Sequence, residues 1–202
     1  MSKQSNINNA LKTTFFGSSV VGKTCVISRI KNNTFNSEEC TIGVSFTRII
    51  QDGINYAIWD TAGQCRFHSL LPMYFRGSSI LVFVFDLSDE KSVLSIDHYV
   101  EQLYNLSDCF VIIVGNKADL VSKEDIEQID IMIRKKIERS LISDIVSHYV
   151  YMSAKRGDGS ADLLKAMHEC ANKIMTLKKD VIVLDDHVKF TEPTVEYNGC
   201  SC

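Results

Sequence analysis

A glycine-rich loop directly after the first apolar run limits the folds open to this chain more than any other feature. The run "LKTTFFG" predicts a strand, and its last residue begins "GSSVVGKT", which fits the pattern G-x-x-x-x-G-K-[ST]. In this pattern backbone N–H groups at a helix N-terminus surround a phosphate, the lysine reaches phosphate oxygens and the hydroxyl ligates Mg²⁺. We therefore expect a phosphate-binding loop between a strand and a helix, formed by Gly17, Ser19, Val20, Val21, Gly22, Lys23, Thr24 and Cys25.

The rest of the chain alternates short apolar runs with segments of helical periodicity, which favours an α/β fold. Asp52 and Gly53 predict a tight hairpin turn, so one strand is expected to be antiparallel. The sequence predicts a mostly parallel six-stranded sheet with helices on both faces. Strands are expected at residues 11–17, 41–50, 54–60, 80–86, 109–117 and 149–155, and helices at 23–32, 66–76, 91–105, 124–141 and 160–177.

Charge and composition exclude some function classes. The net charge of −3, without a long run of Lys and Arg, gives no reason to expect a nucleic-acid partner. The longest apolar stretch, Ile80 to Phe85, is far too short to span a bilayer. Seven cysteines without metal-ligand spacing, in a chain without an export signal, favour the reducing cytosol.

A second motif, "WDTAGQ", follows the hairpin. Asp60 is expected at the carboxyl end of a strand, where open α/β sheets bind ligands and where a Mg²⁺ partner belongs. Gly63 lacks a Cβ and so permits close approach to a γ-phosphate, and Gln64 is placed to orient an attacking water. Alone, these residues could form an ordinary strand end and turn. Together with the phosphate loop they favour a nucleoside triphosphatase.

Two short motifs at later strand ends predict a guanine site. In "NKAD", Asn116 to Asp119, the aspartate accepts the two parallel hydrogen bonds that guanine donates and adenine does not. In "SAK", the Ala154 N–H is expected to meet the guanine carbonyl oxygen. Each motif alone could be a polar loop, but their order and strand-end positions favour base recognition. The expected base contacts are Asn116, Lys117, Asp119, Ser153, Ala154 and Lys155.

On these motifs, and on "TIGVSF", "RFHSL" and "YFRGS", the chain resembles the Rab family of Ras-superfamily small GTPases over about residues 11–178. The resemblance implies a P-loop GTPase domain that binds GTP and GDP with Mg²⁺ and hydrolyses GTP, with Gln64 and Lys23 as catalytic residues. It implies Mg²⁺ ligation by Thr24, Thr41 and Asp60. Phe35 matches the aromatic residue that packs on guanine, although it could instead be a buried residue at a helix end.

The resemblance also implies a role and partners. A Rab-like protein switches between GTP and GDP forms in vesicle and membrane traffic, cycling between the cytosol and the cytosolic face of intracellular membranes. Its expected partners are an exchange factor, a GTPase-activating protein, effectors and a prenyl-carrying chaperone similar to GDI. A monomer is expected. No arginine finger is evident in cis, so hydrolysis should depend on an activator.

Three departures from the family pattern leave an alternative open. Val20 stands where the family usually has Gly, Ser or Ala, and a β-branched residue strains the loop if its φ is positive. Cys65 replaces the acidic residue that normally follows the glutamine, and the stretch from Thr24 through Thr41 to Asp60 is shorter than usual. The alternative is a nucleotide-binding scaffold whose turnover is disabled or very slow.

The chain ends in "YNGCSC", and Cys200 and Cys202 resemble the doubly geranylgeranylated terminus of many Rab proteins. A C-a-a-X box is excluded, because Gly199 is the fourth residue from the end. From Asp180 onward the tail carries five acids and one lysine, so it gains nothing from anionic lipids, and anchoring should need both cysteines. We expect a flexible N-terminus at residues 1–10, a GTPase domain at 11–178 and a flexible tail at 179–202.

Overall fold

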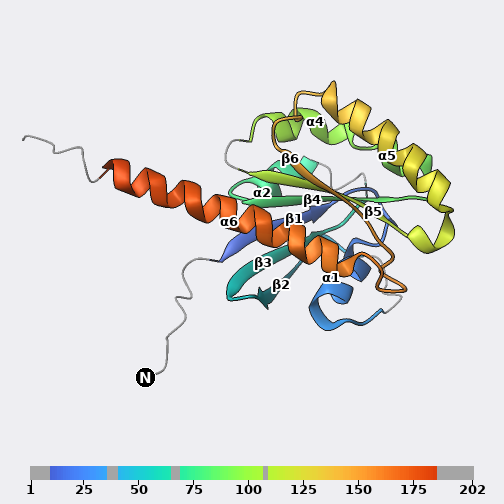
Figure 1. The fold of residues 1–202 in the computed structure, drawn as a ribbon, viewed down its shortest axis with the longest axis horizontal. Helices are drawn as coiled ribbons and strands as arrows, with labels where there is room; N and C mark the ends of the chain where they lie inside the picture. The colour runs from blue at the N-terminus through green and yellow to red at the C-terminus, as the bar shows by residue number, and fades with distance from the viewer. Residues whose placement is uncertain (1–9, 36–40, 65–68, 107–108, 186–202) are drawn as a thin grey trace, which may run out of the picture.

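A sheet of six strands runs through the part of the chain that the structure describes, in the order β2-β3-β1-β4-β5-β6 (Figure 1). The computed structural model describes residues 10–35, 41–64, 69–106 and 109–185, and side-chain surroundings as far as residue 177. Within these ranges only β2 runs antiparallel to its neighbour, so the predicted fold class is confirmed. The strands are β1 (Leu11–Phe16), β2 (Val44–Gln51), β3 (Ile54–Thr61), β4 (Ile80–Asp86), β5 (Phe110–Asn116) and β6 (Val146–Tyr151).

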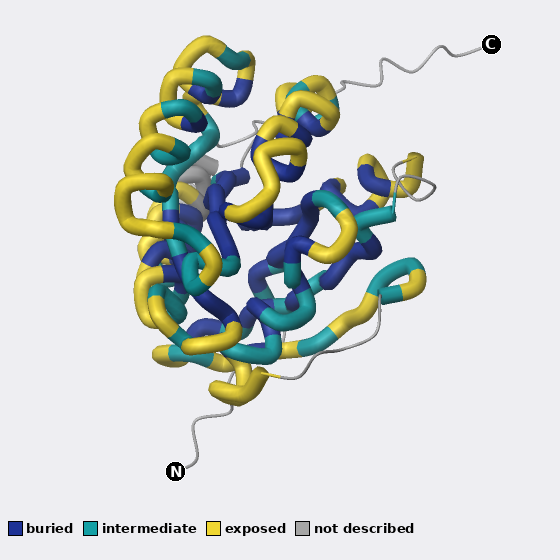
Figure 2. The backbone as a smooth tube through the Cα atoms, turned by 90° about the vertical axis from the view of Figure 1, so that its right-hand side faces the viewer, coloured by how far each residue is buried: buried dark blue, intermediate teal, exposed yellow. Residues whose placement is uncertain are grey.

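Helices cover both faces of the sheet and enclose two apolar cores. Residues of α1 (Lys23–Asn32) and α6 (Ser160–Asp185) share one core with one face of the strands. On the other face pack α2 (Leu71–Phe75), α3 (Glu90–Leu94), α4 (Asp97–Tyr104) and α5 (Lys123–Glu138). Every residue of β4 is buried, as expected for a continuous apolar run covered on both sides. Figure 2 shows the buried central part of the sheet in dark blue, between helices that carry many exposed residues, drawn in yellow.

The predicted hairpin turn is confirmed at Asp52 and Gly53. Their φ angles are 50° and 79°, and positive φ at both central residues is the geometry of a type I′ turn. This turn matches the twist of the flanking strands and pairs β2 with β3 from Val44↔Thr61 to Gln51↔Ile54. The hairpin therefore carries Thr41 back toward the carboxyl end of β3.

The prediction of one helix over residues 91–105 is wrong, because the chain breaks between α3 and α4 at Ser95 and Ile96. Ser92 Oγ donates to the Asp86 carbonyl at 3.0 Å, and Ser95 Oγ donates to the Ser92 carbonyl at 2.7 Å. Such hydrogen bonds from serine side chains to the backbone compete with the regular helical pattern. Two short helices replace the expected long one.

The last strand also differs from the prediction of residues 149–155, since β6 begins at Val146 and ends at Tyr151. After Met152 the chain turns, because the Ser153 N–H donates to the Asp158 carbonyl at 3.0 Å and the Gly157 N–H donates to the Ser153 carbonyl at 2.7 Å. The "SAK" motif therefore lies in the loop after the strand rather than in the strand.

The C-terminal helix is longer than expected, since α6 continues past residue 177 to Asp185. The stretch contains neither Gly nor Pro, so nothing in its local sequence ends the helix there. The predicted domain limit at residue 178 falls inside α6 and stays a prediction. Part of the predicted helix 66–76, and Cys65, Cys200 and Cys202, lie outside the described residues. No helix in the described ranges has the length and apolar character needed to cross a membrane.

Candidate nucleotide site

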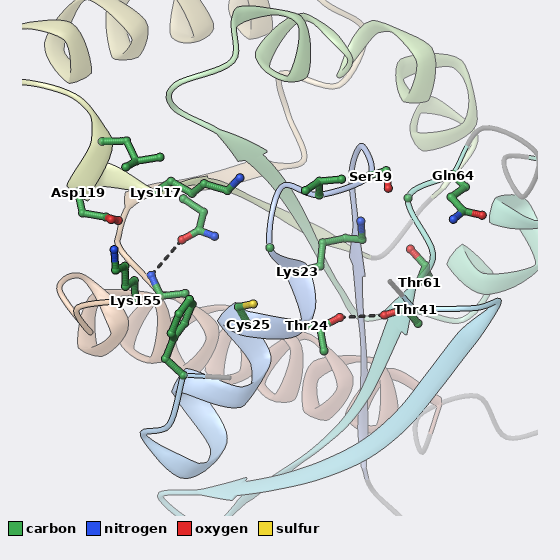
Figure 3. Close-up of a pocket in the computed structure, with 17 residues that line it drawn as sticks. Ser19, Lys23, Thr24, Cys25, Thr41, Thr61, Gln64, Lys117, Asp119 and Lys155 are labelled. Atoms are coloured by element: carbon green, nitrogen blue, oxygen red, sulfur yellow. Dashed lines mark hydrogen bonds between the residues drawn. The ribbon is translucent and has the colours of Figure 1, made fainter. Parts of the chain in front are cut away.

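The predicted motifs gather around one cavity of about 340 Å³, formed by the loops that follow β1, β3, β5 and β6 (Figure 3). Figure 3 places Asp119, Lys117 and Lys155 at one side of this cavity and Lys23, Thr41 and Gln64 at the other. Gly17, Val21, Asp60 and Ser153 are not part of its lining. The predicted residues that line it are Ser19, Val20, Gly22, Lys23, Thr24, Cys25, Phe35, Thr41, Gly63, Gln64, Asn116, Lys117, Asp119, Ala154 and Lys155.

At one end, the loop after β1 presents an uncapped helix N-terminus to the cavity. Helix α1 begins at Lys23 after Gly22, with no hydrogen bond from a capping side chain and no acidic residue in its first turn. The N-terminus of a helix favours an anion, because its first N–H groups point outward and the helix dipole adds a favourable field. Val20 and Gly22 have φ angles of 66° and 91°, as in the alternating backbone of an anion-binding nest.

Lys23 lies under this loop and is almost fully buried, with 6% of its surface exposed. Its Nζ donates to the carbonyl oxygens of Gly17 at 3.0 Å and Ser18 at 2.8 Å. A buried ammonium is costly unless its hydrogen bonds are made, and here backbone carbonyls accept them. The cation is therefore fixed beside the N-terminus of α1.

Two glycines allow the loops to approach closely. A Cβ added to Gly63 would lie 2.3 Å from the Ser18 oxygen and 2.5 Å from Lys23 Nζ. A Cβ added to Gly17, whose φ is 136°, would lie 2.0 Å from the Val84 oxygen. Neither position accepts a side chain without a shift of the backbone, so both glycines are needed for this geometry.

Thr24, Thr41 and Asp60 form a cluster of oxygens beside Lys23. Thr24 Oγ1 donates to Asp60 Oδ2 at 2.5 Å and lies 2.9 Å from Thr41 Oγ1, and Thr41 Oγ1 donates to the same Asp60 oxygen at 3.3 Å. Two hydroxyls and a carboxylate are hard oxygen donors, the type that Mg²⁺ prefers. The chemistry of the three predicted ligands therefore fits a magnesium ion.

Gln64 lies at the same end of the cavity. Its Oε1 is buried and has no hydrogen-bond partner among the residues that the structure describes. A buried amide oxygen without a partner is costly, and a water in the cavity would satisfy it. This geometry fits the predicted role of Gln64 in orienting a water.

At the other end, Asn116 holds two loops together. Its Nδ2 donates to the Val21 carbonyl at 2.9 Å, and its Oδ1 accepts from the Ala154 N–H at 3.0 Å. The Ala154 N–H, predicted to meet the guanine carbonyl oxygen, thus already donates to Asn116 Oδ1. Its contact with guanine stays a prediction, in which Asn116 Oδ1 and the guanine oxygen would share this N–H. Ser153 Oγ donates to Asp119 Oδ1 at 2.6 Å. Ser153 therefore orients the Asp119 carboxylate although it does not itself line the cavity.

Lys117 is held by a residue that the sequence analysis did not single out. Its Nζ lies 2.7 Å from Asp86 Oδ2, and Ser88 donates through both N–H and Oγ to Asp86 Oδ1. Burial alone would raise the pKa of the Asp86 carboxyl, but hydrogen bonds from Lys117 and Ser88 outweigh it and lower the pKa below its ordinary value. The carboxylate is therefore ionised at neutral pH and anchors the lysine.

Phe35 lines the cavity beyond the end of α1 and is 41% exposed. The alternative of a buried residue at a helix end is therefore not what the structure has. Two further residues line the cavity that were not predicted as site residues: Thr61, which lies within "WDTAGQ", and Leu120. Thr61 Oγ1 donates to the Phe15 carbonyl at 2.8 Å, which ties β3 to β1 beside the phosphate loop.

Comparison with known proteins gives concordant matches. The model of the Ras family matches residues 12–175. The GTP-binding protein YPT53 of Saccharomyces cerevisiae is 32% identical over 209 residues, which cover 95% of this chain and 94% of that protein. The Ras-related protein Rab-4 of Dictyostelium discoideum is 31% identical, covering 95% of this chain and 97% of its own length. The Ras-related protein Rab-21 of Homo sapiens is 32% identical, and the match covers 96% of this chain and 90% of that protein.

Proposed function

The chain belongs to the Rab family of Ras-like small GTPases, and from this premise we propose that it is a molecular switch that hydrolyses GTP to GDP and regulates vesicle traffic. The observation that carries the proposal is that one cavity has two chemically different ends. One end combines an uncapped helix N-terminus, a buried lysine and three Mg²⁺-type oxygen donors. The other end presents Asp119 as an acceptor for guanine.

Each residue at the phosphate end has a distinct task in the proposed hydrolysis. Thr24, Thr41 and Asp60 would hold Mg²⁺, which when bound neutralises charge on the β- and γ-phosphate oxygens. Lys23 stabilises the negative charge that develops on the leaving phosphate oxygens, and the backbone N–H groups of the loop assist it. Gln64 orients the attacking water in line with the scissile bond. Among the described residues that line the cavity none is an arginine, which supports dependence on an activating protein.

The alternative is a scaffold that binds the nucleotide but does not turn it over. The full chain would be loaded with radiolabelled GTP, and GTP and GDP would be separated after a single round with Mg²⁺ present. The switch proposal expects conversion of bound GTP to GDP in first-order kinetics, faster with cell extract than without it. Bound GTP that persists unchanged in both conditions would favour the scaffold.

A surface next to Thr41 supports the proposed binding of effectors. Ile42 and Phe46 are 82% and 51% exposed, and the ring of Phe46 packs edge-on against Trp59 with centroids 5.6 Å apart. Exposed apolar groups that gather on one surface are typical of protein–protein contact sites. Because Thr41 contacts Thr24 and Asp60, a change at the phosphate end would move this surface. Effectors, an exchange factor and an activating protein are the proposed partners of the monomer.

Val20→Gly is expected to slow GDP release by about tenfold. A β-branched residue at a φ of 66° stores strain in the phosphate loop, of the order of 1–3 kcal/mol, and about 1.4 kcal/mol corresponds to tenfold in affinity. Release of fluorescent GDP from the full chain would be followed after addition of unlabelled GDP. Val20→Ile, which keeps the branch and the strain, is the control and should release GDP at the parental rate. Equal rates for all three proteins would contradict strain as the limiting factor.

Cys200 and Cys202 are proposed to carry two geranylgeranyl groups that attach the protein to the cytosolic face of membranes. A single lipid gives marginal anchoring, and the acidic tail adds no attraction to anionic headgroups, so Cys200→Ser with Cys202→Ser should make the protein soluble. Intact-mass spectrometry and membrane fractionation of protein from its own cells measure both properties, with Ser201→Ala as the control. A wild-type mass without lipid, or a double variant that stays on membranes, would disprove the assignment.

A further inference from the structure

The side chain of Arg29, on α1, connects three segments around the candidate nucleotide site. Its Nε donates to the Ala154 carbonyl at 2.8 Å, and its Nη2 donates to the Lys155 carbonyl at 2.9 Å. Its Nη1 donates to the Asn33 carbonyl at 2.8 Å and to Asn33 Oδ1 at 3.0 Å. One guanidinium therefore joins α1 to the loop after β6 and to the residues that follow α1.

The loop after β6 depends on Arg29 for its position. Ala154 is held on both sides, because its N–H donates to Asn116 Oδ1 and its carbonyl accepts from Arg29. A Cβ added to Gly157 would lie 3.7 Å from Arg29 Cδ, Nε and Cζ, so the loop packs along the arginine stem. Ala154 and Lys155 line the cavity, and Arg29 thus supports this wall from outside.

Arg29 also contacts the segment that leads to Phe35, another residue of the cavity lining. Asn33 ends α1 in the left-handed conformation, with φ 54°, and its N–H donates to the Arg29 carbonyl at 2.9 Å. The two hydrogen bonds from Nη1 hold the backbone and side chain of Asn33 in this turn. Phe35 follows two residues later and lines the cavity. The left-handed turn at Asn33 therefore sets the direction in which the chain leaves α1 toward Phe35.

We propose that Arg29 is a positioning residue for base recognition, which holds the Ala154–Lys155 wall and the Asn33–Phe35 wall at a separation that fits guanine. This inference rests on the proposed function and adds a residue that does not itself line the described cavity. A guanidinium suits the task, because its planar fork carries five N–H donors and reaches both walls at once. A lysine ammonium is a point charge on a flexible stem and does not reproduce this geometry.

The test compares Arg29→Met, Arg29→Lys and the control Arg139→Met with the wild-type chain, and Arg139 is an exposed residue directly after α5. Displacement of fluorescent GDP by GDP and by ADP, with Mg²⁺ present, gives both dissociation constants. Arg29→Met should weaken GDP about tenfold, about 1.4 kcal/mol, and leave ADP unchanged, because the phosphate end is intact. Arg29→Lys should lie between Arg29→Met and wild type, and Arg139→Met should match wild type.

Two results would overturn the inference. One is a GDP affinity in Arg29→Met and Arg29→Lys equal to that of wild type. The other is an equal loss of GDP and ADP affinity, which a general destabilisation of the domain would produce. Arg29→Lys keeps the charge and the stem and so provides a folded variant if Arg29→Met does not fold. A wild-type chain without preference for GDP would instead refute the proposed function, so the two failures are distinguishable.

Discussion

Asp119→Asn should weaken GTP and GDP binding by about 10²- to 10⁴-fold and favour xanthine nucleotides instead. In the proposed site the aspartate would accept two hydrogen bonds from guanine, each worth about 1.5–3 kcal/mol because the acceptor is charged. An amide presents one donor and one acceptor, which suits xanthine, where a carbonyl replaces the guanine amino group. Ser153 Oγ, which donates to Asp119 Oδ1, finds the amide oxygen of asparagine in the same place, so the loop should keep its shape.

Competition of GTP and XTP for the same fluorescent-nucleotide site measures this change of preference in the full chain. Asp144→Asn is the matched control, because Asp144 is an exposed residue outside the cavity lining of the described chain. The control should bind GTP as the wild type does. Unchanged GTP affinity in Asp119→Asn would show that this carboxylate does not read the base.

Gln64→Leu should lower activator-stimulated GTP hydrolysis by about 10²-fold while leaving nucleotide affinity unchanged. Leucine cannot hydrogen-bond a water, and misplacing a reacting group by about 1 Å costs about 10²-fold in rate. The side chain lines the cavity and has a buried Oε1, whereas the proposed phosphate contacts come from the loop after β1. Binding and hydrolysis should therefore separate in this variant.

Single-turnover hydrolysis in the presence of cell extract gives the rate, and a parallel displacement experiment gives the affinity. Gln128→Leu, on the exposed surface of α5, is the control and should hydrolyse GTP normally. Parental hydrolysis by Gln64→Leu would assign water activation elsewhere and strengthen the scaffold alternative.

Local sequence determined the parts of the site that depend on short stretches of chain. The phosphate loop and the hairpin turn at Asp52 and Gly53 follow from residue type at fixed spacing, whereas the positive φ of Val20 was considered only as a condition for strain. The strand runs were equally informative, since "ILVFVFD" coincides with β4. Each of these features involves neighbours in sequence, and so a pattern is sufficient to predict it.

The supporting contacts could not be predicted in this way. Asp86 meets Lys117 across two strands, and Arg29 meets Ala154 across 125 positions of sequence, so no local pattern marks either contact. The break at Ser95 depends on which carbonyls the serine hydroxyls reach, and the turn at Ser153 depends on Asp158 and Gly157. Tertiary packing decides these positions and overrides local propensity.

Base preference tests the central claim most directly. Full-length protein with fluorescent GDP bound would be challenged with GDP, GTP and ATP, with and without Mg²⁺. The account predicts displacement by GDP and GTP at about one equivalent per chain, ATP weaker by at least about 10²-fold, and faster release when Mg²⁺ is removed. Equal displacement by ATP and GTP, or release that does not respond to Mg²⁺, would contradict a guanine site with Thr24, Thr41 and Asp60 as metal ligands.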